Sequence, residues 1–279
     1  MYDPEGIRKH YNDYGLKEWE RLQRSLHGVV EYENTMSVLR RYLPSSGHLL
    51  DAGGGPGRYT ISLASEGYSM TLVDISDEQL SIAREKIREV GMLDRVQAVR
   101  RMDICDLHEF SNSSFDGVLC LGGALSYVRE GADQAIGELV RVAKPGAPII
   151  VSVMSLLGTY HLISAFDAEG SLRNIRDHVE WDPATPFPEV LNSRVGSPEW
   201  HAPMTLYTSV GLRELLQRNG CTVVEVASTN TITSSYWKGL DKIDASPEAR
   251  DMLIRLEREF CNKPGLVDMG EHLVAVARA

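Results

Sequence analysis

A glycine-dense turn between an apolar run and a helical pattern carries the strongest chemical signal in the sequence. The apolar run, residues 48–52, contains Asp51, and Gly53, Gly55 and Gly57 follow it at alternate positions. A strand, a tight loop and a helix N-terminus in this order direct backbone N–H groups and the helix dipole at a polar ligand. Glycine suits such a loop because its backbone takes positive φ and lets a ligand approach the main chain closely.

The spacing of these glycines distinguishes two kinds of ligand. A dinucleotide fingerprint, G-x-G-x-x-G counted from Gly53, requires glycine where the chain has Arg58. The pattern present is D-x-G-x-G-x-G, which resembles the first motif of the class I S-adenosylmethionine-dependent methyltransferases. In that family the glycine loop holds the methionine part of the cofactor. A nicotinamide dehydrogenase is the alternative, and binding of a nicotinamide dinucleotide would support it.

Two further acids support the same resemblance. Asp74 ends a second apolar run, where an acid can accept hydrogen bonds from both ribose hydroxyls. Asp103 matches the family position whose carboxylate meets the adenine amino group, with its two neighbours flanking the ring. The resemblance covers about residues 47–155 well and 205–279 more loosely. It implies these cofactor-binding residues: Asp51, Gly53, Gly55, Gly57, Asp74, Ile75, Met102, Asp103, Ile104 and Leu121.

The methyl acceptor is expected beside residues 119–127, which end the fourth predicted strand and form the loop after it. Ligands in an open α/β sheet lie beyond the carboxyl ends of the strands, and the resemblance places this segment beside the sulfonium. Gly122 and Gly123 would allow close approach, and Leu125 or Tyr127 would wall the pocket. The sequence identifies no catalytic base. The acceptor-side candidates are Tyr11, Tyr127, His201 and Tyr207, with Tyr14, His161 and His178 also of interest.

Apolar runs alternate with helical patterns through residues 48–155 at the pace of a parallel, doubly wound sheet. The resemblance implies an α/β fold with a seven-stranded, mostly parallel, Rossmann-like methyltransferase sheet, in which residues 272–277 form an antiparallel last strand. Ser76 and the pair Thr208-Ser209 have the sequence context of helix N-caps. A helical N-terminal segment is expected to break at Gly28.

The sequence predicts three regions. Residues 1–46 form an N-terminal helical cap segment, which either packs on the sheet or closes over the cofactor. Residues 47–155 and 207–279 form the S-adenosylmethionine-binding methyltransferase domain. Residues 156–206 hold five of the twelve prolines and are too long for a bare connector, so we expect an inserted substrate lid.

The composition limits the kinds of partner that we expect this chain to bind. The net charge is −10 and no basic stripe is evident, so a nucleic-acid substrate is not expected. There is no apolar run of membrane-spanning length and no signal peptide, which predicts a cytoplasmic protein without membrane contact. The four cysteines lack metal-site spacing and are expected to be buried, reduced thiols. No metal is expected, and the oligomeric state is left open.

Methyl transfer from a sulfonium is an in-line displacement on an activated group, so the protein must mainly align the reactants and exclude water. A general base is needed only when the acceptor carries a proton. The sequence therefore predicts an S-adenosylmethionine-dependent methyltransferase that acts on a small molecule and releases S-adenosylhomocysteine. The alternatives are an RNA or protein methyltransferase and a non-catalytic, cofactor-binding regulatory protein.

Overall fold

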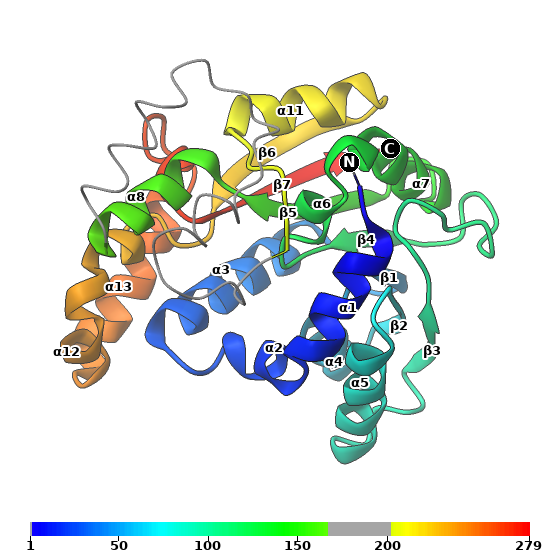
Figure 1. Cartoon of the computed structure of the whole chain (residues 1–279), viewed down its shortest axis with the longest axis horizontal. Coiled ribbons are helices and arrows are strands. Elements are labelled where there is room, and N and C mark those ends of the chain that lie inside the picture. The colour runs from blue at the N-terminus through cyan, green and yellow to red at the C-terminus, as the bar shows by residue number, and fades with distance from the viewer. Residues whose placement is uncertain (1, 167–201) are drawn as a thin grey trace.

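The computed structural model describes residues 2–166 and 202–279 (Figure 1). Within these residues lies a seven-stranded sheet in the order β3-β2-β1-β4-β5-β7-β6. The strand β7 runs antiparallel to both of its neighbours, β5 and β6, and the other pairings are parallel. This confirms the predicted fold. The strands are β1 (His48–Ala52), β2 (Ser69–Asp74), β3 (Val96–Arg101), β4 (Gly117–Cys120), β5 (Pro148–Met154), β6 (Thr222–Ser228) and β7 (His272–Arg278).

Helices cover both faces of the sheet (Figure 1). One apolar core joins the sheet to α7 and α11, and a second joins the opposite face to α3 and α4. Every residue of β5 is buried, as expected for a strand covered on both faces. The helices are α1 (Pro4–Tyr14), α2 (Leu16–Arg21), α3 (Leu26–Tyr42), α4 (Arg58–Ser65), α5 (Asp77–Glu89), α6 (Ala124–Tyr127), α7 (Ala132–Val142), α8 (Leu156–Phe166), α11 (Ser209–Arg218), α12 (Leu240–Asp244) and α13 (Pro247–Phe260).

The predicted caps at Ser76 and at Thr208-Ser209 are confirmed, since the hydroxyls of Ser76 and Thr208 accept backbone N–H groups at the starts of α5 and α11. The predicted break at Gly28 is wrong. The chain turns earlier, and Ser25 caps α3, which runs through Gly28. A Cβ on Gly28 would collide with the carbonyl oxygen of Arg21. Glycine is therefore required here by the close approach of two chain segments rather than by a break in the helix.

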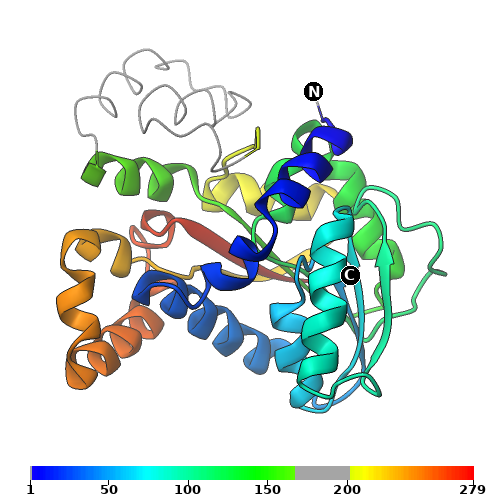
Figure 2. The ribbon, with the colours of Figure 1, turned by 60° about the horizontal axis from the view of Figure 1, so that its bottom comes forward.

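Hydrogen bonds hold the N-terminal helices α1 and α2 beside the start of α5 (Figure 2). Asn12 accepts hydrogen bonds from the Ser76 hydroxyl at 2.7 Å and from the Glu78 amide at 3.2 Å. The side-chain amide of Gln79 donates to the carbonyls of Tyr11 and Gly15. Helix α3 instead packs on the sheet, and closure of the first part of the segment over a cofactor stays a prediction.

The predicted lid is described only at its two ends. Residues 156–166 form α8, and residues 202–207 return to the C-terminal end of β5, where Ser155 and Tyr207 form a parallel bridge. His178 and His201 lie outside the described residues. All four cysteines are free and buried, as predicted. The described helices include none that is long and apolar enough to cross a membrane.

Candidate active site

The loop between β1 and α4 has the conformation that the glycine spacing predicted. Gly53, Gly55 and Gly57 have φ values of +71°, +53° and +81°, a region that favours glycine. A Cβ on Gly53 would lie 2.6 Å from the Cβ of Ala124, so that position also lacks room for a side chain. A Cβ on Gly55 would meet only the Cγ of Glu18, at 3.9 Å. The loop therefore presents bare backbone beside Gly55.

Two buried carboxyl groups lie at the carboxyl ends of β1 and β2. Oδ2 of Asp51 accepts a hydrogen bond from the Thr60 hydroxyl at 2.6 Å, whereas its Oδ1 has no partner within the described residues. Asp74 accepts the amides of Gly55 at 2.9 Å and Ser76 at 2.8 Å. Burial raises the pKa of both Asp51 and Asp74 to about 6. Each is thus a poorly solvated anion at neutral pH, which a donor or cation of a ligand would stabilise.

Asp103 lies at the predicted adenine end of the site, with Tyr2 against it. Its Oδ1 accepts the Cys105 amide and its Oδ2 accepts the Tyr2 hydroxyl, both at 2.8 Å. Burial and the hydrogen bond to Asp103 raise the pKa of the Tyr2 phenol. Met102 and Ile104 are buried on either side of the acid. Sequence reasoning did not single out Tyr2, because nothing in the local pattern shows that the N-terminus reaches β3.

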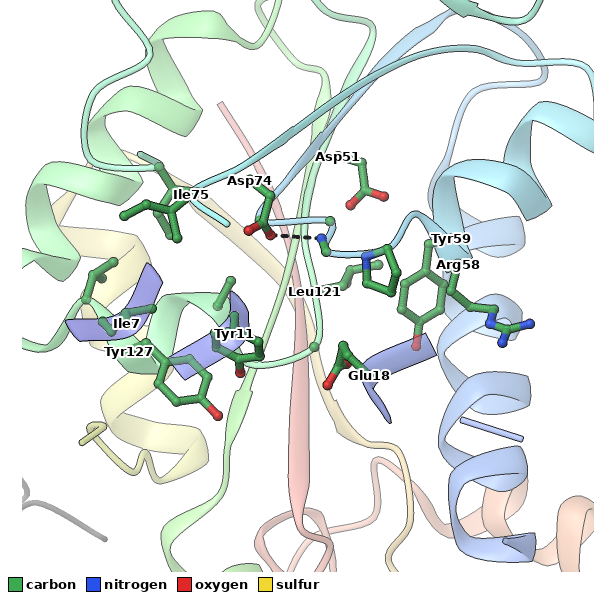
Figure 3. Close-up of a pocket in the computed structure, with 18 of the residues that line it drawn as sticks. Ile7, Tyr11, Glu18, Asp51, Arg58, Tyr59, Asp74, Ile75, Leu121 and Tyr127 are labelled. Carbon is green, nitrogen blue, oxygen red and sulfur yellow. Dashed lines mark hydrogen bonds between the residues drawn. The ribbon is translucent and has the colours of Figure 1, made fainter. Parts of the chain in front are cut away.

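All of the predicted cofactor residues except Gly57 line one pocket (Figure 3). Gly57 instead forms the N-cap of α4, and its α-carbon faces Leu72 and Ala83. The pocket fits S-adenosylmethionine in two respects: the unpaired Oδ1 of Asp51, and the carboxylates that can accept the donors of ribose and adenine. No group of three or more His, Cys, Asp or Glu in the described residues could hold a metal ion.

Of the acceptor-side candidates, Tyr11 and Tyr127 line this pocket. Their rings meet edge to face with centroids 5.5 Å apart, and burial raises the pKa of both phenols. In Figure 3 they lie across the pocket from Asp51 and Asp74. Leu125 lies in the core rather than on the pocket wall.

Tyr207 does not line the pocket. Its amide donates to the carbonyl of Met154, and its side chain packs on the core that α7 and α11 cover. His161 lies 3.5 Å from the carbonyl of Met269 and does not line the pocket either. His201 is outside the described residues.

The wall opposite the glycine loop includes charged residues that sequence reasoning missed. Glu18 and Arg21 of α2 form an ion pair at 3.0 Å, and both line the pocket. Burial raises the pKa of Glu18. On the side of the glycine loop, Arg58 begins α4 and lines the pocket, and its guanidinium lies 3.6 Å above the Trp19 ring. The only sequence signal was an acid and a base three positions apart, which is ordinary on a solvated helix.

Comparison with known proteins agrees with this geometry. Residues 49–146 match the family model described as a methyltransferase domain. A phosphatidylethanolamine N-methyltransferase of Cereibacter sphaeroides is 33% identical over 38% of this chain and 49% of its own length. The matched part thus spans about half the length of this curated relative.

Solved structures share the fold over most of the chain. A methyltransferase of Thermotoga maritima, described as a possible histamine N-methyltransferase, has a TM-score of 0.59 and 16% identity, covering 97% of this chain and 98% of that one. Geranyl diphosphate C-methyltransferase of Streptomyces coelicolor, solved with S-adenosylhomocysteine, has a TM-score of 0.57 and 14% identity, covering 88% and 79%. At these identities the likeness establishes the fold alone. Residues 49–146 thus match a methyltransferase domain, and the glycine loop and the shared fold support the class I S-adenosylmethionine-dependent methyltransferases as the family of that domain.

Proposed function

We propose that this chain transfers the methyl group of S-adenosylmethionine to a small molecule and releases S-adenosylhomocysteine. The observation that carries the proposal is a single pocket in which the glycine loop, Asp51, Asp74 and Asp103 meet. Asp74 would hold the ribose hydroxyls and Asp103 the adenine amino group. The loop at Gly53 and Gly55 would receive the methionine end. When bound, the cofactor supplies a methyl group on a positively charged sulfur.

The protein's own task is then alignment and exclusion of water. Helix α1 and Leu22, which directly follows α2, supply a wall that includes Ile7 and Tyr11. Apolar and aromatic side chains at this position would keep water from the reacting atoms. We assign Tyr11 and Tyr127 to the acceptor side, because they line the part of the pocket opposite the acidic strand ends.

Two observations favour a small acceptor over RNA or protein. The N-terminal helices cover the pocket, which leaves less room for a polymer than an open strand edge would. The charge of the chain is −10, which disfavours contact with a polyphosphate backbone. A non-catalytic, cofactor-binding protein has the same cofactor residues, so only product formation separates it from an enzyme.

The test has two stages. Calorimetry with S-adenosylmethionine and S-adenosylhomocysteine is expected to show binding of both to the purified protein. Incubation with a panel of small acceptors is then expected to give a product heavier by one methylene group. Binding without any methylated small molecule would contradict the proposal, and methylation of RNA or protein in parallel incubations would identify the alternative. Failure of folded protein to bind either cofactor form would overturn it at the first stage.

A further inference from the structure

A buried group of ionisable side chains adjoins the turn that follows β4. Gly122 lines the pocket, and a Cβ on it would lie 3.8 Å from Nη2 of Arg21. A Cβ on the next residue, Gly123, would lie 3.9 Å from Cε1 of His272. His272 is the first residue of β7 and pairs with the last residue of β5, Met154. The antiparallel strand therefore begins at the edge where the parallel strands end, beside the candidate site.

Arg21 and His272 are linked through Glu31 of α3. Nη1 of Arg21 donates to both carboxylate oxygens of Glu31, at 3.0 Å and 2.8 Å. Oε1 of Glu31 lies 3.9 Å from Nε2 of His272. Although burial opposes ionisation, Arg21 and His272 lower the pKa of Glu31 to about 2. Glu31 is therefore an anion that faces the imidazole.

The other ring nitrogen of His272 is unused. The residue is 5% exposed, and its Nδ1 has no hydrogen-bond partner in the part of the chain that the structure describes. An unpaired polar atom is unfavourable when buried. Such an atom beside a ligand pocket is explained if a ligand supplies the partner.

The group beyond the turn contains two carboxyl groups and one guanidinium, apart from Glu18. Glu18 faces the glycine loop, so we assign it to the cofactor. That leaves Glu31 and Glu271 against the guanidinium of Arg21. His27 lies 3.4 Å from Glu271, but burial lowers the pKa of His27 to about 4, so it adds no positive charge at neutral pH. Burial also raises the pKa of Glu271, and a cationic group of a ligand would relieve the cost of its ionisation.

We propose that this group is the methyl-acceptor subsite, that the acceptor is an amine, and that His272 receives its proton. This inference rests on the proposed function. The ammonium form would be drawn in by Glu31 and Glu271. Nδ1 of His272 takes one proton and leaves a neutral amine. The nitrogen lone pair then bonds to the methyl carbon, while the methyl–sulfur bond breaks with its electron pair staying on sulfur. The products are a methylated ammonium ion, a neutral thioether and an imidazolium facing Glu31.

A binding experiment tests the subsite without turnover. The protein saturated with S-adenosylhomocysteine is titrated with phenylalkyl amines, alcohols and carboxylic acids of matched length. We expect the amines to bind more tightly than their matched alcohols and acids, and we expect His272→Gln and Glu31→Gln to remove the difference. Equal or weaker binding of the amines would overturn the inference. Binding tests this inference and product formation tests the proposed function, so the two can fail separately.

Kinetics test the proton transfer. Besides Glu31, the charged and titratable groups around His272 are Arg21 of α2, His27 of α3 and the adjacent Glu271. With an amine acceptor, we expect His272→Gln to lower kcat by about 100-fold and to keep its affinity for S-adenosylhomocysteine. The fall in wild-type kcat towards acid pH should be absent in this variant. Full activity of His272→Gln, or methylation of alcohols or acids but not amines, would overturn the inference.

Two further variants test whether Glu31 acts in the reaction or only in folding. Glu31→Gln should raise KM for the amine and also lower kcat, because Glu31 attracts the ammonium group and faces the imidazolium that forms at His272. His48→Gln is the matched control: His48 begins β1 at the opposite edge of the sheet and bonds to Thr71. Its kcat and pH profile should equal those of the wild type. If Glu31→Gln does not fold, His272→Gln and its control still decide the proposal.

Discussion

The amide of Gly55 donates to Oδ2 of Asp74 across 2.9 Å, and this bond ties the loop after β1 to the end of β2 (Figure 3). Oδ1 of the same carboxylate accepts the Ser76 amide at 2.8 Å, at the start of α5. Asp74 therefore holds together the two segments between which a nucleoside would lie. Its carboxylate is positioned before any ligand binds, which lowers the ordering cost of binding.

Replacing Asp74 by alanine should weaken S-adenosylmethionine binding by about 1–3 kcal/mol, because the ribose hydroxyls lose a charged acceptor. The two amide bonds to the loop are lost as well, so Asp74→Asn, which keeps one acceptor oxygen, should lose less affinity. Calorimetry measures both. Asp251→Ala, which removes an exposed acid of α13, should bind like the wild type. Unchanged affinity in Asp74→Ala would remove Asp74 from the site.

Cofactor binding should weaken towards acid pH. Burial raises the pKa of Asp74 to about 6, so the free protein holds mostly the protonated carboxyl at pH ~5. Binding that needs the anion must then expel a proton. Linkage gives a loss of about tenfold in affinity between pH ~7.5 and pH ~5 for one such group. Calorimetry across this range should show it in the wild type and show a flatter dependence in Asp74→Asn. Equal slopes would assign the pH dependence to another group.

Asp51 is expected to lower stability at neutral pH. Burial raises its pKa from 3.8 to about 6, so its contribution to stability is fully present below about pH 4 and is lost as pH rises through about 6. Asp51→Asn removes the buried charge and keeps an oxygen for the Thr60 hydroxyl. The free energy of unfolding should rise by about 1–3 kcal/mol at pH ~7.5, and the gain should be smaller at pH ~5. Urea unfolding at both pH values measures this, and a gain independent of pH would contradict it.

The strand ends of the site were predictable because parallel strands bring their carboxyl ends to one edge. Asp74 and Asp103 each follow an apolar run, so local patterns place them there. Glu18 and Arg21 were not predictable in the same way, because only the packing of α2 against the glycine loop distinguishes them from a solvated pair. His272 is an intermediate case. An antiparallel last strand was predicted, and its first residue must then lie beside the C-terminal ends of the parallel strands.

Two of the interpretations that pointed elsewhere, those of Tyr207 and Gly28, have a common physical cause. Tyr207 adjoins β5 through its backbone, but its side chain turns to the core that α7 and α11 cover. The position of Tyr207 in the sequence, close to residues of the site, therefore did not determine the direction of its ring. Gly28 was interpreted as a break in the helix, although its role is to permit contact with the carbonyl oxygen of Arg21. Both outcomes depend on tertiary packing, which local propensity does not contain.

The two requirements at Gly53 can be separated by a matched pair of alanine variants. Gly53 has φ +71° and Gly91 has φ +70°, so alanine meets the same backbone strain at both positions, about 1–2 kcal/mol. A Cβ on Gly53 also lies 2.6 Å from Ala124, whereas a Cβ on Gly91 has no atom within 4 Å. Gly53→Ala should therefore lower the free energy of unfolding by about 1–3 kcal/mol more than Gly91→Ala. Gly53→Ala should also weaken S-adenosylmethionine binding, and Gly91→Ala should leave it unchanged. Urea unfolding measures both losses of stability, and equal losses would mean that the loop moves away from Ala124 at little cost. Unchanged binding of S-adenosylmethionine to Gly53→Ala would show that the cofactor does not need the backbone at Gly53.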